Sequence, residues 1–338
     1  MILEFIDIKD VYYPYDDVIK DYLSRENADI KDYKCERKNQ ASPIVIKWKT
    51  DIDSVVTQKF IYSLEPDFKK CIQIKVDADK REVELFNLFK ASTYYCKLII
   101  NDKYEIKSSF KTTDLGPRII NVDGIFNVRD VGGYIGYKGK RTKQGLLYRS
   151  GALTICVDRH FDNIVQITSK GKKTLSKELK IKTEFDIRKE EEALFLKKSL
   201  IPNAKLIYLP TNGYLSAFTE SEKYRDVFKA LAVKEYYPIC IHCTGGADRT
   251  GTVCFILNAL LGVCESDLIH DYEITTFSIY GIRDSKERGS LLQFCEFYEY
   301  FRTHYQGETL REKANDYLLS IGVLKEEIKS IINIMSGE

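Results

Sequence analysis

The stretch from residue 239 to residue 261 constrains the fold of this chain most. A short apolar run, Ile239–Ile241, leads into a polar segment that contains two adjacent glycines. After it, apolar residues recur at helical spacing and share one face: Val253, Ile256, Leu257, Leu260 and Leu261. A buried strand that turns directly into a helix is typical of an α/β sheet, and it leaves the polar segment at the helix N-terminus.

The polar segment combines a thiol with the features of an anion site. It reads, in order, His242, Cys243, Thr244, Gly245, Gly246, Ala247, Asp248, Arg249, Thr250 and Gly251. A helix N-terminus presents backbone N–H groups and the positive end of the helix dipole, so it attracts anions. In such surroundings the pKa of a cysteine falls from about 8.5 to about 3.5–7.5, which produces a nucleophilic thiolate. We therefore expect Cys243 to attack phosphorus, and hydrolysis of a phosphate ester is the leading hypothesis.

The rest of the segment suits a phosphate and a sulfur anion. We expect the backbone N–H groups of residues 244–248 to surround the phosphate oxygens, because adjacent glycines permit positive φ and close approach. The planar fork of Arg249 can hold two phosphate oxygens at once, which a lysine cannot do. We expect Thr250 to donate its hydroxyl hydrogen bond to the sulfur. His242 is expected to orient the segment through its ring rather than to act as a base.

The leaving oxygen needs a proton, and two acids are candidates for supplying it. Asp248 is the preferred general acid because it directly precedes Arg249, although an acid in a first helical turn can instead hold that arginine in place. Asp186 ends a predicted strand, where α/β sheets face their ligands. Its alternative role is that of a structural partner of a nearby arginine. Arg129 and Asp130 are expected in an internal charge network, with pocket lining as the alternative.

The spacing of residues 242–251 resembles the signature loop of the cysteine-dependent protein tyrosine phosphatases. The aspartate directly before the arginine resembles the bacterial branch whose loop ends in Asp-Arg-Thr-Gly. Further segments that resemble this branch are Asn127–Gly133, Gly145–Ser150, Phe185–Arg188 with Glu192, Leu261–Val263 and Asp271–Thr275. The resemblance covers residues 117–338. It implies hydrolysis of phosphotyrosine through a phosphocysteine, without a metal or other cofactor.

The resemblance also bears on the substrate. Some members that resemble this chain accept phosphoserine, phosphothreonine or phosphoinositides as well. Ala247 stands where related loops often carry a lysine, and losing that cation weakens binding of multiply charged headgroups more than of a single phosphate. A phosphotyrosine protein or peptide is therefore the expected partner, with a phosphoinositide or inositol polyphosphate as the alternative. A phospho-binding module without turnover is an alternative of another class, against which the intact Cys243 and Arg249 argue.

Periodicity predicts two domains. Residues 1–116 are expected to form a small all-β sandwich, since apolar side chains alternate in sets such as Ile44, Ile46 and Trp48, or Tyr94, Cys96, Leu98 and Ile100. The pattern resembles a fibronectin type III or immunoglobulin-like module. Residues 1–40, in which Val18–Leu23 predicts a short helix, are placed with this domain. Residues 117–338 are expected to form an α/β phosphatase domain, with a mostly parallel central sheet flanked by helices and a helical C-terminus.

Two local signals mark a helix near the C-terminus. Thr309 and Glu312 have the spacing of a capping box, which predicts that a helix begins after Thr309. Gly322 is placed to end that helix.

Composition excludes several classes of partner. Lys and Arg total 52 and Asp and Glu total 50, so no basic excess points to nucleic acid. No apolar stretch reaches the roughly 18 residues of a membrane helix, so no stable membrane insertion is expected. The nine cysteines are an odd number in a large chain, which favours a reducing, cytoplasmic compartment. A leader removed from the N-terminus would instead allow secretion.

A metal site is not expected in the polar segment. Cys240 and Cys243 have the C-x-x-C spacing of redox and zinc sites. Side chains three residues apart along a strand project to opposite faces, however, and no second pair completes a zinc site.

Overall fold

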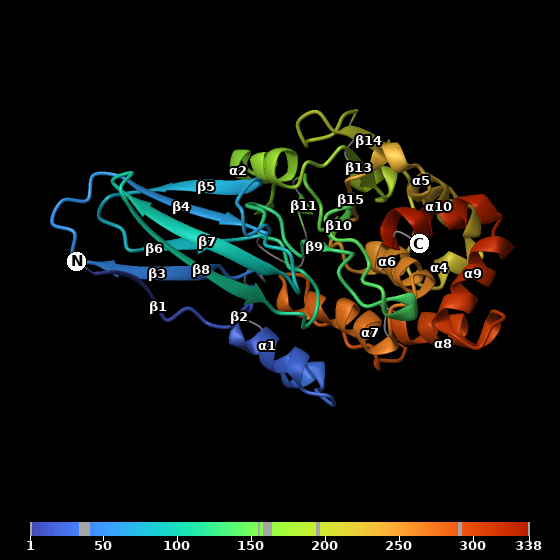
Figure 1. Ribbon diagram of the computed structural model, residues 1–338. Coiled ribbons are helices and arrows are strands. Elements are labelled where there is room, and N and C mark those ends of the chain that lie inside the picture. The colour runs from blue at the N-terminus through green and yellow to red at the C-terminus, as the bar shows by residue number, and fades with distance from the viewer. Residues whose placement is uncertain are drawn as a thin grey trace. The chain divides into compact units, whose positions relative to one another are not determined.

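The computed structural model describes residues 2–33, 41–154, 156–157, 164–193, 197–289 and 293–336. The chain separates into two compact units, Met1–Lys20 with Ala41–Leu115 and Asp21–Gln40 with Gly116–Glu338. Figure 1 labels their helices and strands.

The first unit contains two β-sheets around one core. The larger has the order β2-β8-β7-β4-β5, formed by Val11–Tyr12, Tyr104–Thr112, Thr93–Ile100, Gln58–Ser63 and Cys71–Val76. The smaller has the order β1-β3-β6, formed by Leu3–Ile6, Ile44–Thr50 and Glu82–Leu85. Trp48 of β3 stacks on Phe60 of β4 with ring centroids 6.5 Å apart, so side chains of both sheets meet in the core. The likeness to a fibronectin type III or immunoglobulin module stays a prediction.

The second unit is built on a five-stranded sheet in the order β14-β13-β15-β10-β9. The strands are Lys205–Tyr208, Thr183–Asp186, Ile239–His242, Leu147–Ser150 and Arg129–Asp130. β14, β13, β15 and β10 run parallel, and only β9 pairs antiparallel in this sheet. His242 lies in register with Asp186 and with Ser150, so the carboxyl ends of three parallel strands meet where the polar loop begins.

Apolar side chains cover both faces of this sheet. Ile239 and Ile241 belong to one hydrophobic cluster, and Cys240 between them belongs to another. Cys243 lies in the first cluster, so the two cysteines of the C-x-x-C spacing are on opposite sides of the sheet. Burial on both faces is what a parallel sheet requires.

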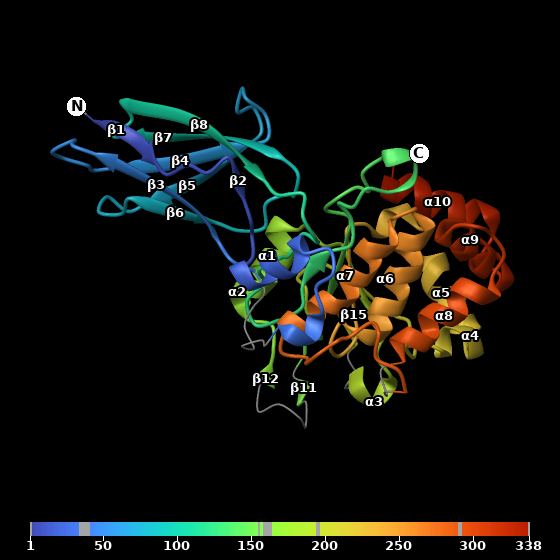
Figure 2. The ribbon, with the colours of Figure 1, turned by 90° about the horizontal axis from the view of Figure 1, so that it is seen from below.

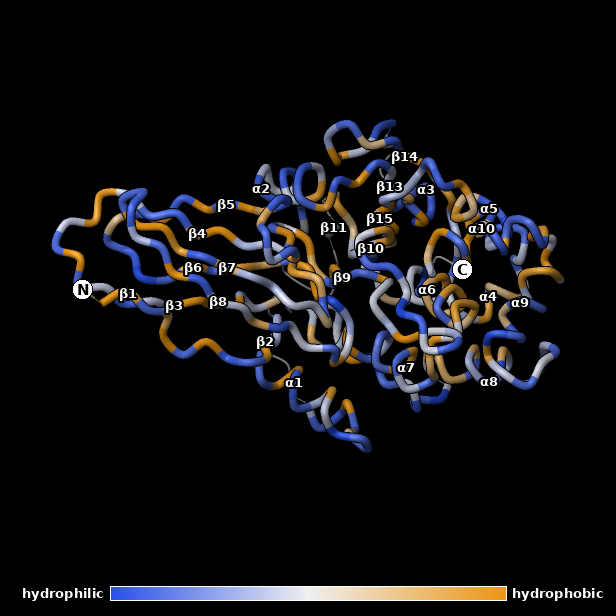
Figure 3. Tube along the Cα trace, in the orientation of Figure 1, coloured by the Kyte–Doolittle hydropathy of each residue, from blue (hydrophilic) through white to orange (hydrophobic). Residues whose placement is uncertain are grey.

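The helix after the loop, α6 (Asp248–Leu260), is buried all round. The sequence predicts one apolar face, but every residue from Thr250 to Leu260 is buried. The helix shares one hydrophobic cluster with residues of α5 (Ser221–Leu231), α7 (Glu265–Glu273), α8 (Phe294–His304), α9 (Leu310–Ser320) and α10 (Lys325–Ser336). Figure 2 shows α6 between β15 and the C-terminal helices, and Figure 3 shows hydrophobic residues concentrated along it. A helix enclosed in this way needs apolar residues on all sides.

The remaining elements are short. They are α1 (Asp17–Ser24), α2 (Ser169–Lys173), α3 (Glu190–Ala193), α4 (Ser216–Thr219), the turns η1 (Ile30–Asp32), η2 (Tyr137–Gly139), η4 (Lys234–Tyr236) and η5 (Ile274–Phe277), the π-helix η3 (Thr174–Glu178), and the strands β11 (Cys156–Val157) and β12 (Ile164–Val165). Within the described ranges, none of the helices is both long enough and apolar enough to cross a bilayer.

Residues 21–33 group with the second unit, whereas the sequence placed all of residues 1–40 in the first domain. Tyr22 contributes to this grouping, because its hydroxyl donates to Glu273 Oε2 and its ring packs against His270 and Phe277. Tyr33 packs against the same phenylalanine. These aromatic contacts join the segment to α7 and η5.

Candidate active site

The loop from Cys243 to Arg249 lies between the end of β15 and the first turn of α6. Cys243 is only 1% exposed. Gly246 has φ +64°, and a Cβ at this position would collide with the backbone of Ser150, so the loop needs glycine there. The backbone carbonyl of Thr244 accepts a hydrogen bond from the Ala152 amide at 2.9 Å, which ties the loop to the segment after β10.

Side chains from outside the loop donate hydrogen bonds to its backbone carbonyl groups. Arg149 Nη2 donates to the carbonyl oxygens of Gly246 and Ala247 at 2.7 and 3.2 Å. Asn127 Nδ2 donates to the carbonyl oxygen of Gly245 at 3.0 Å. Because the C=O and N–H of a trans peptide point in opposite directions, fixing these carbonyls leaves the N–H groups on the other side of the loop. Backbone N–H groups that share one side of a loop are a suitable arrangement for an anion.

A buried charge network supports this arrangement. Asp271 is shared by two arginines: Arg129 Nε donates to its Oδ1 at 2.7 Å, and Arg149 Nη1 donates to its Oδ2. Arg129 Nη1 also donates to Asn127 Oδ1 at 2.6 Å. Burial alone would raise the pKa of Asp271, but the two guanidinium groups outweigh burial and hold that pKa below its usual range. Arg129 is therefore linked to the loop indirectly, through Asn127 and Asp271.

Asp130 belongs to a different buried cluster. Its carboxylate pairs with Arg118 Nη1 at 2.8 Å and accepts the backbone N–H groups of Gly132 and Gly145. Burial raises the pKa of Asp130. These contacts fix the turn beside β9 and β10. They fit the internal charge network expected for Asp130 better than the alternative, in which it lines the pocket.

Arg249 is oriented by Glu192 of α3. Both terminal nitrogens of the guanidinium donate to the carboxylate, with Nη2 at 2.9 Å from Oε1. The Thr244 hydroxyl donates to the same Oε1 at 2.9 Å. Burial would raise the pKa of Glu192, but the hydrogen bonds and charge of Arg249 outweigh it and lower the pKa to about 2. The sequence showed Glu192 only as part of a resembling segment, and its role follows from this contact.

The thiol of Cys243 is electrostatically favoured as a thiolate. Burial would raise its pKa, but the charge of Arg249 and the hydrogen bonds of Thr250 outweigh burial and bring the pKa below its ordinary value. Within the described part of the chain, the buried Thr250 hydroxyl bonds no other nitrogen or oxygen atom. It is therefore available to the sulfur.

His242 and Asp186, at the carboxyl ends of β15 and β13, both bond buried side chains. His242 Nε2 lies 2.9 Å from Glu184 Oε1. Burial would lower the pKa of His242, but the hydrogen bond to Glu184 and the charge of Asp186 raise it. Asp186 pairs with Arg188 Nη2 at 2.6 Å and is 1% exposed. This geometry favours a structural partner of an arginine over a proton donor to substrate.

Glu184, Asp186 and His242 also have the composition of a metal site. Their ligand atoms lie within 4.8 Å of one another. The imidazole already bonds Glu184, however, and Arg188 already occupies the Asp186 carboxylate. A cation would have to displace a buried guanidinium, so these contacts disfavour a metal.

The carboxylate of Asp248 accepts hydrogen bonds from two residues. The Tyr214 hydroxyl donates to its Oδ1 at 2.6 Å, and Arg283 Nε donates to the same oxygen at 3.0 Å. Asp248 and Arg249 line a cavity of about 500 Å³, together with Lys189, Glu191, Asn212 and Tyr214. Nothing in the sequence singled out Tyr214 or Arg283, because they lie 34 and 35 residues away from Asp248.

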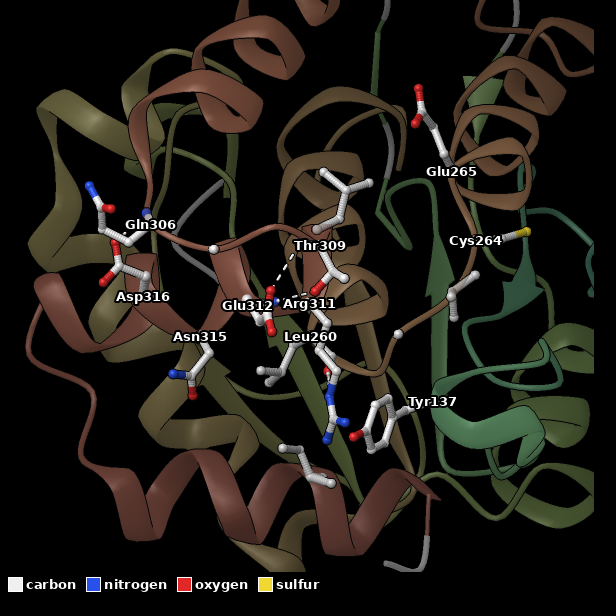
Figure 4. A pocket seen from close by; sticks show the side chains of 15 residues that line it. Tyr137, Leu260, Cys264, Glu265, Gln306, Thr309, Arg311, Glu312, Asn315 and Asp316 are labelled. Atoms are coloured by element: carbon white, nitrogen blue, oxygen red, sulfur yellow. Dashed lines mark hydrogen bonds between the residues drawn. The ribbon is translucent and has the colours of Figure 1, made fainter.

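A larger cavity, of about 820 Å³, lies away from Cys243, at the C-terminal end of α6. Figure 4 shows Arg311 beside Tyr137 on its wall, with the guanidinium carbon 3.5 Å from the ring centroid. Glu312 in the same wall is committed to the helix cap at Thr309. Of the two cavities, the smaller one is lined by Asp248 and Arg249 of the loop, and the larger one by none of the loop residues 243–249.

Comparisons with known proteins match a phosphatase family and two curated phosphatases. The model of a family described as "Tyrosine phosphatase family" matches residues 120–296. A protein of Cupriavidus necator that is named as a tyrosine-protein phosphatase is 30% identical over 179 residues, which is 44% of this chain and 60% of the relative. A tyrosine-protein phosphatase of Nostoc commune is 30% identical over 126 residues, covering 32% of this chain and 42% of the relative. The chain thus spans about half the length of these curated relatives.

A solved structure also matches, but its backbone superposes on this chain with a low TM-score. It is the core catalytic domain of the PP-IP phosphatase SIW14 from S. cerevisiae in complex with citrate, at 21% identity and a TM-score of 0.31, covering 47% of this chain and 85% of that one. An overlay of this quality carries no argument about substrate.

Proposed function

Since the chain belongs to the tyrosine phosphatase family, we propose that it hydrolyses phosphate monoesters with Cys243 as the nucleophile. The observation that carries this proposal is the loop itself. Its carbonyls are bonded by Arg149 and Asn127, its thiol has a lowered pKa, and Arg249 is held at its edge by Glu192.

In the first step, the Cys243 thiolate attacks phosphorus in line with the leaving oxygen. The S–P bond forms as the P–O bond to the leaving group breaks, and that oxygen takes a proton from the carboxyl group of Asp248. The products are a phosphocysteine, the released alcohol or phenol, and the Asp248 carboxylate. Loop N–H groups and Arg249 stabilise the phosphoryl oxygens during the transfer.

In the second step, water attacks the same phosphorus. The new P–O bond forms as the S–P bond breaks, inorganic phosphate leaves, and the water proton returns to Asp248. Thr250 stabilises the departing thiolate, since its buried hydroxyl has no other bonded nitrogen or oxygen in the described residues. His242 and Asp186 act by position, through Glu184 and Arg188.

The proposed substrate is phosphotyrosine in a protein or peptide. The cavity beside Asp248 and Arg249 is roomy enough for a phenyl ring, and Ala247 offers no second loop cation. Phosphoserine and phosphothreonine are further substrates under a dual specificity. A phosphoinositide is the second candidate, because the exposed Lys189 lines the same cavity and can meet a second anionic group.

The proposed activity belongs in a reducing compartment such as the cytoplasm, because only a reduced Cys243 can attack phosphorus. The first unit, predicted as a fibronectin- or immunoglobulin-like sandwich, contributes none of the groups named in this mechanism.

Release of p-nitrophenol from p-nitrophenyl phosphate, in the presence of a chelator, tests the reaction. Vanadate should block turnover. Cys243→Ser should abolish phosphate release yet still bind a phosphate analogue, whereas Cys264→Ser, at an exposed cysteine outside the loop, should behave as wild type. Near-normal turnover by Cys243→Ser would show that Cys243 is not the nucleophile.

Two further measurements test the acid and the substrate. Asp248→Asn should slow esters with poor leaving groups far more than activated aryl esters, because only the former need a proton. Equal losses would assign Asp248 a structural role. A side-by-side release assay should favour phosphotyrosine peptides over phosphoinositides in kcat/KM, and the reverse order would select the second candidate.

A further inference from the structure

Arg283 holds the carboxylate of Asp248 together with the Tyr214 hydroxyl. Arg283 Nε lies 3.0 Å from Asp248 Oδ1, and Nη2 lies 3.3 Å from Oδ2. The remaining nitrogen, Nη1, donates to the carbonyl oxygens of Tyr280 and Ile282 at 2.8 and 3.1 Å. The guanidinium is thereby tied to its own loop, residues 278–289, which we call the Arg283 loop. A displacement of this loop would weaken the two hydrogen bonds from Arg283 to the carboxylate of Asp248.

The two residues that follow Arg283 are each held by a polar contact, one to a lysine and one to a glutamate. The Asp284 side chain is 3% exposed and pairs with Lys31 Nζ at 2.6 Å. The backbone N–H of Ser285 donates to Glu273 Oε1 at 2.9 Å. The other oxygen of Glu273 accepts the hydroxyl of Tyr22. Both anchors therefore lead to the segment of residues 21–33.

Two tyrosines of that segment pack against aromatic side chains of α7 and η5. Tyr22 is buried, and its ring centroid lies 5.5 Å from those of His270 and Phe277. Tyr33 lies 6.1 Å from the Phe277 centroid, and its hydroxyl donates to Asp21 Oδ2 at 2.9 Å. Buried aromatic side chains contribute much of the packing energy of a contact. These contacts anchor the segment against α7 and η5, where it can support the Arg283 loop.

We propose that Tyr22 and Lys31 are positioning residues of the active site. Through Glu273 and Asp284 they hold the Arg283 loop, and through Arg283 they set the place of Asp248. The inference rests on the proposed function, in which Asp248 transfers the proton. Residues 21–33 lie outside the residues 120–296 that match the family model, so this support is not part of the matched region.

The test is a leaving-group series with Tyr22→Phe and Lys31→Met. Tyr22→Phe keeps the ring and removes only the hydroxyl that bonds Glu273, and Lys31→Met removes the cation that pairs with Asp284. With phenyl phosphate or a phosphotyrosine peptide, each should lower kcat by about five- to tenfold, a part of the roughly 10²–10⁴ that a general acid contributes. With an activated aryl phosphate, kcat should stay at the wild-type value. Lys31→Arg should restore the wild-type pattern.

Matched controls come from the same segment. Tyr33→Phe and Arg25→Met remove a hydroxyl and a cation whose partner is Asp21, inside the segment. Both should show wild-type turnover with every leaving group. A vanadate inhibition constant and a melting temperature for each variant establish that the loop still binds an anion and that the fold persists.

The outcomes separate this inference from the proposed function. If Asp248→Asn depends on the leaving group but the folded Tyr22→Phe and Lys31→Met variants do not, the positioning role is overturned and the proton-transfer role stands. If Asp248→Asn itself shows no leaving-group dependence, the proton-transfer role falls and the positioning role falls with it. Equal losses on all esters would assign Tyr22 and Lys31 to general stability, which also overturns the inference.

Discussion

Arg149 donates a hydrogen bond from Nη2 to the carbonyl oxygen of Gly246 across 2.7 Å. The donor comes from β10 and the acceptor from the loop after β15, so a neighbouring strand holds the loop in shape. The guanidinium is completely enclosed and shares Asp271 with Arg129. The conformation of the loop thus depends on a charge network behind it as well as on its own glycines.

Asp271→Asn should lower both stability and substrate affinity. Removing one partner of a buried ion pair leaves uncompensated charge and costs about 3–5 kcal/mol. We expect a loss of that order in the free energy of unfolding, measured by urea denaturation, together with a raised KM. Asp226→Asn is the control, since this α5 aspartate is largely exposed, and it should change the free energy by no more than about 0.5 kcal/mol. If Asp271→Asn and Asp226→Asn had the same free energy of unfolding, the proposed importance of the charge network for stability would be contradicted.

Gly246→Ala should abolish turnover, whereas Gly245→Ala should be tolerated better. Gly246 has φ +64° and no room for a Cβ against Ser150. A Cβ on Gly245 would lie 3.3 Å from the Tyr280 ring, a tight contact that a small shift of the ring relieves. Phosphate release and vanadate binding by both variants measure the difference. Comparable activity of the two alanine variants would refute a positional need for glycine at 246.

Glu192→Gln should reduce kcat/KM by about 10- to 100-fold. The carboxylate makes charge-assisted hydrogen bonds to Arg249, each worth about 1.5–3 kcal/mol, and about 1.4 kcal/mol corresponds to a factor of ten. Because the pKa of Glu192 is lowered to about 2, the pair stays charged at neutral pH and the ratio to wild type should not vary there. Glu191→Gln, at an exposed neighbour that lines the same cavity, is the control and should be nearly silent. A silent Glu192→Gln would show that Arg249 needs no external partner.

The rate of Cys243 alkylation should reveal the lowered pKa of its thiol. The thiolate is the reacting form, so a lower pKa moves the midpoint of the rate–pH curve below the value of about 8.5 for an ordinary cysteine. Thr250→Ala should move the midpoint upward, because it removes a hydrogen bond to the sulfur. Mass spectrometry of the separate peptides distinguishes Cys243 from the exposed Cys71 and Cys264. A wild-type midpoint at or above about 8.5 would argue against an activated thiol.

Local patterns predicted the elements with strong, short-range signals. The helix expected over Val18–Leu23 is present as Asp17–Ser24. The capping box of Thr309 and Glu312 is formed, and Gly322 has φ +89° just beyond the end of α9. Each of these signals lies within a few residues of the structure it specifies, so the sequence is sufficient to read it.

Elements that depend on distant neighbours were less predictable. The spacing of apolar residues suggested a one-faced α6, and its burial on all sides follows from helices as far along the chain as α10. Residues 21–33 join the second unit through Tyr22 and Glu273, which lie 251 residues apart. The sequence contains no local signal for such a contact.

The sequence by itself determined where a thiol, an arginine and a helix N-terminus come together, because Cys243 and Arg249 are separated by a single loop whose covalent geometry limits how far apart they can be. The tertiary structure alone decided which groups orient them. Arg149 and Asp271 are 122 residues apart, Arg249 and Glu192 are 57 apart, and Asp248 and Arg283 are 35 apart. Charges this distant along the chain meet only once the sheet and helices have packed, since burial then makes each of them require a partner.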